Sequence, residues 1–156
     1  MAPTSVGVSA ALRGSLNPFP ESMSTPESPE ALLRHIYDLY RSGDLSEFPK
    51  IISPGCEWVF PGDPGILPWA GTYRGLGIFD FAAKIVGSIA YEHFEDHTYL
   101  PSGDSVVVLL RERCRVLATG KVFHNDIAAV ATVRDGLLVR YVEYSDTGAM
   151  ERAFGK

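Results

Sequence analysis

Three polar side chains interrupt the apolar faces of strands predicted in the second half of the chain: Glu112, Asn125 and Glu143. A carboxylate in apolar surroundings is costly unless it is hydrogen-bonded, shares a proton or meets water in a pocket. Burial also moves the pKa of a carboxyl group toward neutrality, where general acid–base catalysis is most effective. These three residues and the nearby Tyr141 are therefore the candidate catalytic residues.

Side chains alternate between the two faces of a strand, and this alternation separates charged from apolar residues. In the strand predicted over residues 105–117, Glu112 shares its face with valine, leucine and cysteine. Asn125 lies on the apolar face of the next predicted strand, 121–133. The opposite faces carry charged residues that we expect to pair across the two strands: Arg111, Arg113, Arg115, His124 and Asp126.

The turn sequences predict which residues face one another across these strands. A two-residue Thr-Gly turn would place Glu112 opposite Ile127, and a three-residue Arg-Asp-Gly turn would place Glu143 opposite the same residue. The two acids would then flank one strand with backbones ~10 Å apart, so we expect them to share one proton.

Helical and strand periodicities succeed one another along the chain. Ser28 and Pro29 predict the start of a first helix that ends at Ser42-Gly43, and Asp146 is expected to cap a short last helix. Helices first and an antiparallel sheet afterwards predict an α+β fold in which the helices cover one apolar face of the sheet. The other expected elements are helices at 44–52 and 76–88, a strand at 56–60, and strands at 90–100, 105–117, 121–133 and 137–145.

Apolar and aromatic residues in several of these elements could line a pocket for an apolar ligand. The predicted substrate-binding residues are Trp58, Phe60, Trp69, Tyr73, Phe79 and Ile127. Residues Leu138, Arg140, Val142 and Tyr144 are expected on the opposite, exposed face.

Composition narrows the class of protein. The chain has 156 residues, 46% of them hydrophobic, which suits one domain with a core over residues 29–156. Residues 1–28 are rich in serine and proline and are expected to form a disordered tail, and Met23 could be the natural start. A net charge of −5 argues against nucleic acid and anionic membranes as partners. Two cysteines in apolar contexts indicate buried thiols in a cytoplasmic protein, and no tight pattern of metal ligands is present.

Four segments resemble the SnoaL-like, ketosteroid isomerase-like family of the NTF2-like superfamily: "WVFPG", "WAGTYRG", "GDSVVVL" and "RDGLLVRYVEYSDT". The resemblance covers about residues 29–154 and implies a cone-shaped α+β fold with a curved sheet around an apolar pocket. It also implies that Glu143 matches an acid used by the family's polyketide cyclases and epoxide hydrolases, and that Glu112 matches a second acid of those hydrolases. Their partner residues are replaced, an arginine by Leu110 and a histidine by Ala129.

Members of this superfamily include isomerases, cyclases, epoxide hydrolases, dehydratases and binding domains, so the fold alone does not assign a reaction. Residues and resemblance together predict an enzyme without cofactor or metal that transfers protons on an apolar oxygenated molecule, such as a polyketide, terpenoid or steroid-like compound. Asn125 and a tyrosine would brace the enolate oxygen. The alternatives are a limonene-type epoxide hydrolase and a non-catalytic domain that binds a hydrophobic ligand. The resemblance further implies a homodimer formed through the exposed sheet face.

Overall fold

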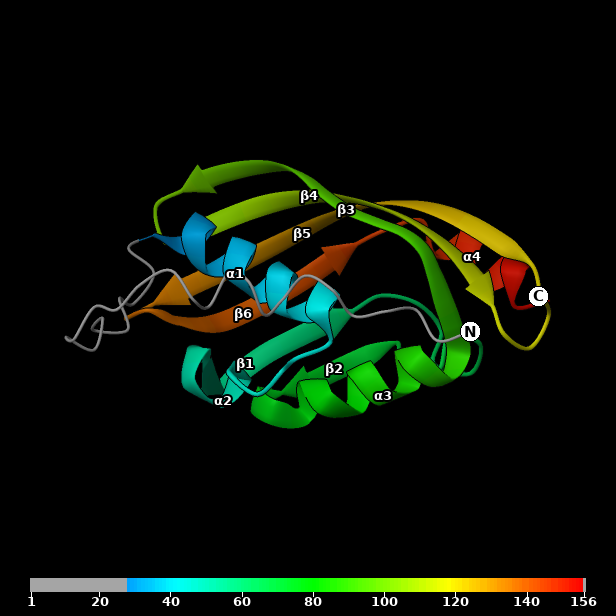
Figure 1. The fold of residues 1–156 in the computed structure, drawn as a ribbon, viewed down its shortest axis with the longest axis horizontal. Helices are drawn as coiled ribbons and strands as arrows, with labels where there is room; N and C mark the ends of the chain where they lie inside the picture. Colours follow the sequence, from blue (N-terminus) through cyan, green and yellow to red (C-terminus); the bar gives the residue numbers. More distant parts are fainter. Residues whose placement is uncertain (1–27, 156) are drawn as a thin grey trace, which may run out of the picture.

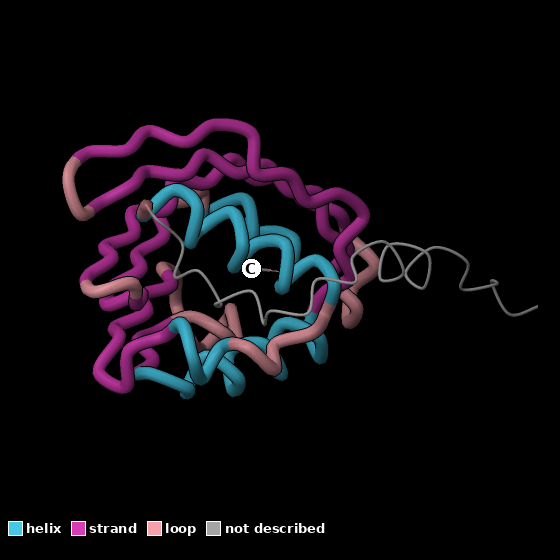
Figure 2. The backbone as a smooth tube through the Cα atoms, turned by 60° about the vertical axis from the view of Figure 1, so that its left-hand side comes forward, coloured by secondary structure: helices cyan, strands magenta, loops and turns pink. Residues whose placement is uncertain are grey.

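The computed structural model describes residues 28–155, in which a curved six-stranded sheet wraps around helix α1 (Figures 1 and 2). The elements in chain order are α1 (Pro29–Ser42), α2 (Phe48–Ile51), β1 (Ile52–Phe60), β2 (Gly71–Arg74), the short 3-10 helix η2 (Gly75–Gly77), α3 (Ile78–Ser88), β3 (Ile89–Ser102), β4 (Ser105–Val116), β5 (Val122–Arg134), β6 (Leu137–Tyr144) and α4 (Thr147–Ala153). The predicted α+β class is confirmed. The predicted tail falls almost wholly on residues 1–27, outside the described part of the chain.

The strands follow the order β2-β1-β6-β5-β4-β3, and one neighbouring pair differs from the prediction. β1 and β6 run parallel, whereas the sheet was expected to be antiparallel throughout. A parallel pair needs a long connection, and everything from β2 to β5 lies between these two strands in the sequence. β2 was also missed, because its four residues follow a proline- and glycine-rich stretch that reads as a loop.

Three helix caps predicted from the sequence are confirmed. The Ser28 hydroxyl accepts a hydrogen bond from the backbone N–H of Ala31 (3.1 Å), and Gly43 ends α1 with a φ of 74°. The Asp146 carboxylate accepts from the N–H of Ala149 (2.9 Å) at the start of α4. Asp146 is therefore occupied as a helix cap, as expected.

The turn between β4 and β5 is longer than predicted. The backbone N–H of Val116 donates to the carbonyl of Lys121 (2.8 Å), so residues 117–120 make the turn instead of two residues. Glu112 consequently faces Asn125, two positions from its predicted partner. A displacement of two residues preserves the side-chain alternation, and Glu112 still points to the inner face of the sheet.

The turn between β5 and β6 is tighter than predicted. Asp135–Gly136 closes it with two positive φ angles, 51° and 75°, as a two-residue hairpin requires. A register shift between Thr132 and Val133 then brings Glu143 opposite Ala129 instead of the predicted Ile127.

This irregularity also moves one residue that was expected on the exposed face. Leu138 is fully buried in the core, beside Ile52 of β1, and not on the outer face with Arg140 and Tyr144. Arg140 and Tyr144 are exposed, as predicted. Val142, which was also expected to be exposed, is only 6% exposed, in a strand position flanked by Val59 of β1 and Val130 of β5. The predicted homodimer through the outer face stays a prediction.

Cys56 and Cys114 are both buried free thiols, as expected. None of the helices within residues 28–155 is long and apolar enough to cross a membrane.

Candidate functional site

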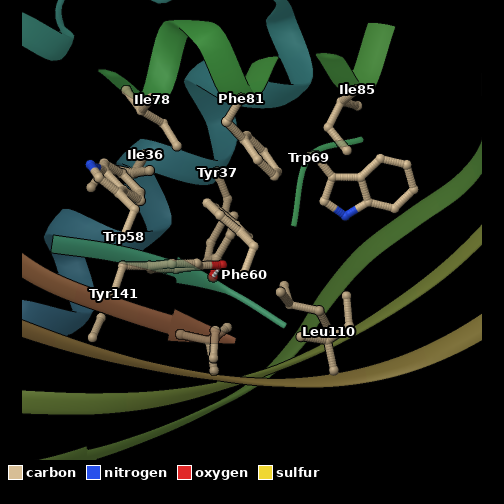
Figure 3. Close-up of a cluster of buried hydrophobic side chains, with 14 of the residues drawn as sticks. Ile36, Tyr37, Trp58, Phe60, Trp69, Ile78, Phe81, Ile85, Leu110 and Tyr141 are labelled. Atoms are coloured by element: carbon tan, nitrogen blue, oxygen red, sulfur yellow. Dashed lines mark hydrogen bonds between the residues drawn. The ribbon is translucent and has the colours of Figure 1, made fainter. Parts of the chain in front are cut away.

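An apolar cavity lies between the concave face of the sheet and helices α1 and α3 (Figure 3). A water-sized molecule can be centred within about 70 Å³ of it, and all the empty space around its lining, open solvent included, is about 830 Å³. Four of the six predicted substrate-binding residues line it: Trp58, Phe60, Trp69 and Ile127. The aromatic side chains come from β1 and the loop after it, and α3 adds Phe81, which stacks on Phe60 with ring centroids 3.7 Å apart.

The structure does not bring the other two predicted residues into the cavity. The Tyr73 hydroxyl donates to the backbone carbonyl of Trp69 (2.9 Å) and accepts from Lys84 (3.2 Å), so Tyr73 supports the wall from behind. Phe79 is 38% exposed and packs on Phe48, because the buried face of α3 carries Ile78, Phe81 and Ile85.

Glu143 is positioned by two tyrosines at the cavity wall. The Tyr141 hydroxyl donates to Oε1 of Glu143 (3.0 Å), and the hydroxyl of Tyr37 from α1 lies 2.9 Å from that of Tyr141. Figure 3 shows Tyr37 and Tyr141 meeting between helix and sheet. Burial raises the pKa of Glu143 to about 8, with a further increase from the charge of Glu112 and an opposing effect of the Tyr141 bond.

The second carboxylate, Glu112, is 6% exposed and bonded to Asn125, whose Nδ2 lies 3.1 Å from its Oε1. Burial raises the pKa of Glu112 to about 7, and the Asn125 bond lowers it in part. Asn125 is engaged at both ends: its Nδ2 also approaches the sulfur of Met150 (3.6 Å), and its Oδ1 accepts from the N–H of Asp146 (3.1 Å). Asn125 therefore orients Glu112 and holds α4, and its amide is not free to brace a ligand oxygen.

The two acids line one cavity but do not form the predicted pair. Glu112 faces Asn125 and Glu143 faces Ala129, so Ile127 lies between those two positions on β5. Among the described residues no hydrogen bond joins the two carboxylates, and the predicted sharing of one proton is not observed. Each acid instead has one bonded oxygen and a second oxygen without a partner in residues 28–155.

Sequence reasoning missed three tyrosines that line the cavity: Tyr37, Tyr40 and Tyr91. The hydroxyls of Tyr40 and Tyr91 lie 2.8 Å apart. Tyr37 shares the buried face of α1 with Leu33 and Ile36, and this spacing is the signal that could have found it. The contact between Tyr40 of α1 and Tyr91 of β3 is made by the tertiary fold, so no sequence pattern could have predicted it.

The lining of the cavity limits what it can bind. No lysine, arginine or histidine in the described part of the chain lines it, although two carboxylates do. Among residues 28–155, no three His, Cys, Asp or Glu side chains are grouped so as to hold a metal ion. The geometry instead provides two acids with raised pKa values among aromatic rings, an arrangement suited to proton transfer.

Comparison with known proteins identifies structures that share this fold. An NTF2-like protein from Burkholderia xenovorans LB400 is 25% identical, with a TM-score of 0.74 over 81% of this chain and 95% of that one. TerC, whose structure was determined with polyporic acid, is also 25% identical, with a TM-score of 0.67 over 82% of this chain and 98% of that one. IdmH from Streptomyces antibioticus, described as a candidate polyketide cyclase, shares the fold at 19% identity, with a TM-score of 0.63 over 82% of this chain and 99% of that one. The family model described as the SnoaL-like domain matches residues 33–141, and the chain belongs to this family.

Proposed function

We propose that the protein is an enzyme without cofactor that transfers a proton, by means of Glu143, on an apolar oxygenated small molecule. The observation that carries the proposal is Glu143 itself, a carboxylate with a pKa near 8 that lines an aromatic cavity and has one oxygen held by Tyr141. Its second oxygen is the one that would take a proton from a carbon next to a carbonyl group. Isomerisation and aldol-type cyclisation both proceed from that step.

The class of substrate follows from the walls of the cavity. Aromatic and aliphatic side chains surround the two acids, which suits a polyketide, terpenoid or steroid-like compound. The similarity to TerC, which was crystallised with polyporic acid, supports an organic small molecule as the ligand.

Epoxide hydrolysis is the less favoured alternative within the same fold. That reaction would need the two acids to activate one water together. Glu112 is bonded to Asn125 and Glu143 to Tyr141, and the two acids face positions of β5 that are four residues apart. Leu110, where the related hydrolases carry an arginine, is 1% exposed and apolar.

Hydrogen–deuterium exchange tests the proposal without knowledge of the natural substrate. The methyl group of 2-acetylnaphthalene, a neutral aryl ketone, exchanges in D2O when a base removes its proton. We expect the protein to accelerate this exchange, and Glu143→Gln to reduce the acceleration by about 100-fold or more. Glu57→Gln, which changes an acid on the outer face, is the matched control.

The outcomes separate the alternatives. Equal exchange rates for the protein and Glu143→Gln would show that another group is the base. Binding of the ketone without any acceleration would favour the non-catalytic binding domain.

A further inference from the structure

The hydrogen-bond donors of the cavity are nearly all engaged within the protein. Tyr141 donates to Glu143, and Tyr37 bonds to Tyr141. Both ends of the Asn125 amide are used. The indole N–H of Trp58 donates to the carbonyl of Gly75 (3.0 Å).

The Tyr40–Tyr91 pair keeps one hydroxyl hydrogen beyond its mutual bond. Either tyrosine can carry this hydrogen, and the charges of the inner acids reach the pair, so Tyr40→Phe is needed as a control for this third donor. Two donors elsewhere in the lining differ from these. The Ser145 hydroxyl is buried without a partner in the described part of the chain, and the Trp69 indole N–H makes no hydrogen bond to those residues, although it is not among their buried unpaired atoms.

Ser145 carries a buried hydroxyl that makes no hydrogen bond to any residue in the described range 28–155. An unsatisfied buried polar group costs about 1–3 kcal/mol, so such a group in a native protein calls for a partner that the protein itself does not supply. Ser145 directly follows β6 and is two residues beyond Glu143, with its backbone held by the capped start of α4 at Asp146. Its hydroxyl therefore lies in a fixed part of the cavity wall near the proposed base.

Trp69 is 5% exposed and is held firmly in the loop between β1 and β2. Its carbonyl accepts from Tyr73 (2.9 Å), and its ring packs edge-on against Phe154 with centroids 5.6 Å apart. In Figure 3 the indole nitrogen is turned toward the sheet, on the side of the cavity where Leu110 lies. Leu110 pairs with Ile127, so this is the part of the sheet between the two acids.

We infer that Ser145 and Trp69 bind a carbonyl oxygen of an uncharged ligand, beside the carboxylate that takes its proton. Two neutral donors stabilise the negative charge that develops on this oxygen when the neighbouring carbon loses a proton. Above pH 8, where both acids are largely ionised, a ligand that already carries a carboxylate or phosphate is rejected, because the residues among 28–155 that line the cavity include two acids and no cation. The inference rests on the proposed function for the cavity as the ligand site, but not on Glu143 acting as the base.

Binding of three naphthalenes to the full chain tests the inference, with affinities from calorimetry. The probes are 2-acetylnaphthalene labelled with 13C at its carbonyl, 2-ethylnaphthalene, which lacks the oxygen, and anionic 2-naphthoate. At pH 9, where both inner acids are largely ionised, we expect the ketone to bind at least about 10-fold more tightly than naphthoate. Its carbonyl 13C resonance should move downfield on binding. Ser145→Ala and Trp69→Phe should each weaken ketone binding about 3–10-fold and reduce the downfield shift, with ethylnaphthalene affinity unchanged.

The controls distinguish hydrogen bonding from packing. Ser145→Ala should leave the free energy of unfolding without ligand unchanged or higher, because it removes an unpaired buried hydroxyl. The inference would be overturned if Ser145→Ala and Trp69→Phe weakened the binding of ketone and ethylnaphthalene equally. It would also be overturned if Tyr40→Phe, and not these two variants, abolished the 13C shift. Tighter binding of naphthoate, or no binding of any probe, would also overturn it. Glu143→Gln should retain the 13C shift, so a failure of the proposed base and a failure of these donors are distinguishable.

Discussion

Glutamates lie on both faces of the curved sheet, and their surroundings differ. On the outer face, Glu92 accepts from Arg113 (2.8 Å) and Arg115 (2.7 Å). On the inner face, the hydrogen bonds of Glu112 and Glu143 come from neutral groups, an amide and a phenol. The outer acids are compensated by cations, whereas the inner acids line a cavity without any.

This difference separates structural charges from candidate functional ones. An exposed ion pair contributes little to stability, but it also costs little to maintain. A buried carboxylate without a cation destabilises the fold whenever it is ionised, and proteins retain such groups mainly at functional sites. The inner acids are therefore where the activity of the protein should be sought, and each prediction below tests the contrast between the two faces.

The largest effect should come from moving a charge from the outer to the inner face of one strand. Leu109 and Leu110 are neighbours on β4, but Leu110 is 1% exposed whereas Leu109 is half-buried on the outer face. We expect Leu110→Asp to lower the free energy of unfolding by about 4 kcal/mol or more, and Leu109→Asp by about 1 kcal/mol or less. Urea denaturation measures both free energies of unfolding. The less disruptive substitutions Leu110→Ala and Leu109→Ala provide a second comparison of the same two positions. Similar losses at the two positions would contradict the assignment of faces.

The next effect concerns the dependence of stability on pH. Burial raises the pKa of Glu112 to about 7 and of Glu143 to about 8, above their ordinary value of 4.5. Between pH 4.5 and 8 the native state therefore binds more protons than the unfolded state, and stability falls as the pH rises. One pKa unit is worth about 1.4 kcal/mol, so even one unit at each acid removes about 3 kcal/mol between pH 5 and 9.

Urea denaturation at a series of pH values checks this expectation. The double variant Glu112→Gln/Glu143→Gln should flatten the decline, whereas Glu92→Gln on the outer face should leave it unchanged. Stability that increases from pH 5 to 9 in the unmodified protein would show that the inner acids are ionised in the native state at neutral pH.

The faces of the strands could be predicted from the sequence, but the partners across them could not. Glu112, Asn125 and Glu143 were assigned to the inner face from alternation alone, and an error of two residues in each register did not disturb that assignment. The registers depended on the lengths of two turns and on one extra residue in β6, Val139, which alternation does not encode. Leu138 was placed on the wrong face because Val139 interrupts the alternation between Leu138 and Arg140.

Residues outside the long strands were harder to place. Phe79 and Phe81 are two positions apart in α3, yet only Phe81 reaches the cavity, because the rotation of a helix is set by the surface against which it packs. Tyr37 reaches Glu143 through Tyr141 across 104 residues of sequence, a contact made by the tertiary fold. The resemblance to the SnoaL-like family predicted the architecture that makes these contacts possible, but not the contacts themselves.

A smaller effect is expected in the pH dependence of the ketone exchange reaction. If Glu143 is the base, the rate rises with pH and levels off above a midpoint near 8. Glu112→Gln removes a negative charge that raises this pKa, so the midpoint should move down by about half a unit, as expected for one charge acting through a partly solvated interior. Glu57→Gln, on the outer face, should leave the midpoint in place. An unchanged or higher midpoint in Glu112→Gln would mean that the inner acids do not influence each other.

The smallest effect is expected for the outer ion pairs. Arg111 and Asp126 bond at 3.0 Å, but their side chains are 58% and 78% exposed, so water and salt screen the attraction. Arg111→Ala, Asp126→Ala and the double variant should give a coupling energy of about 0.5 kcal/mol or less, measured by urea denaturation and reduced further in 1 M salt. A coupling energy of 2 kcal/mol or more would place this pair among strongly coupled buried interactions. The outer ion pairs would then contribute substantially to the stability of the sheet. The presence of a cation beside an acid would no longer show that the acid makes only a small contribution.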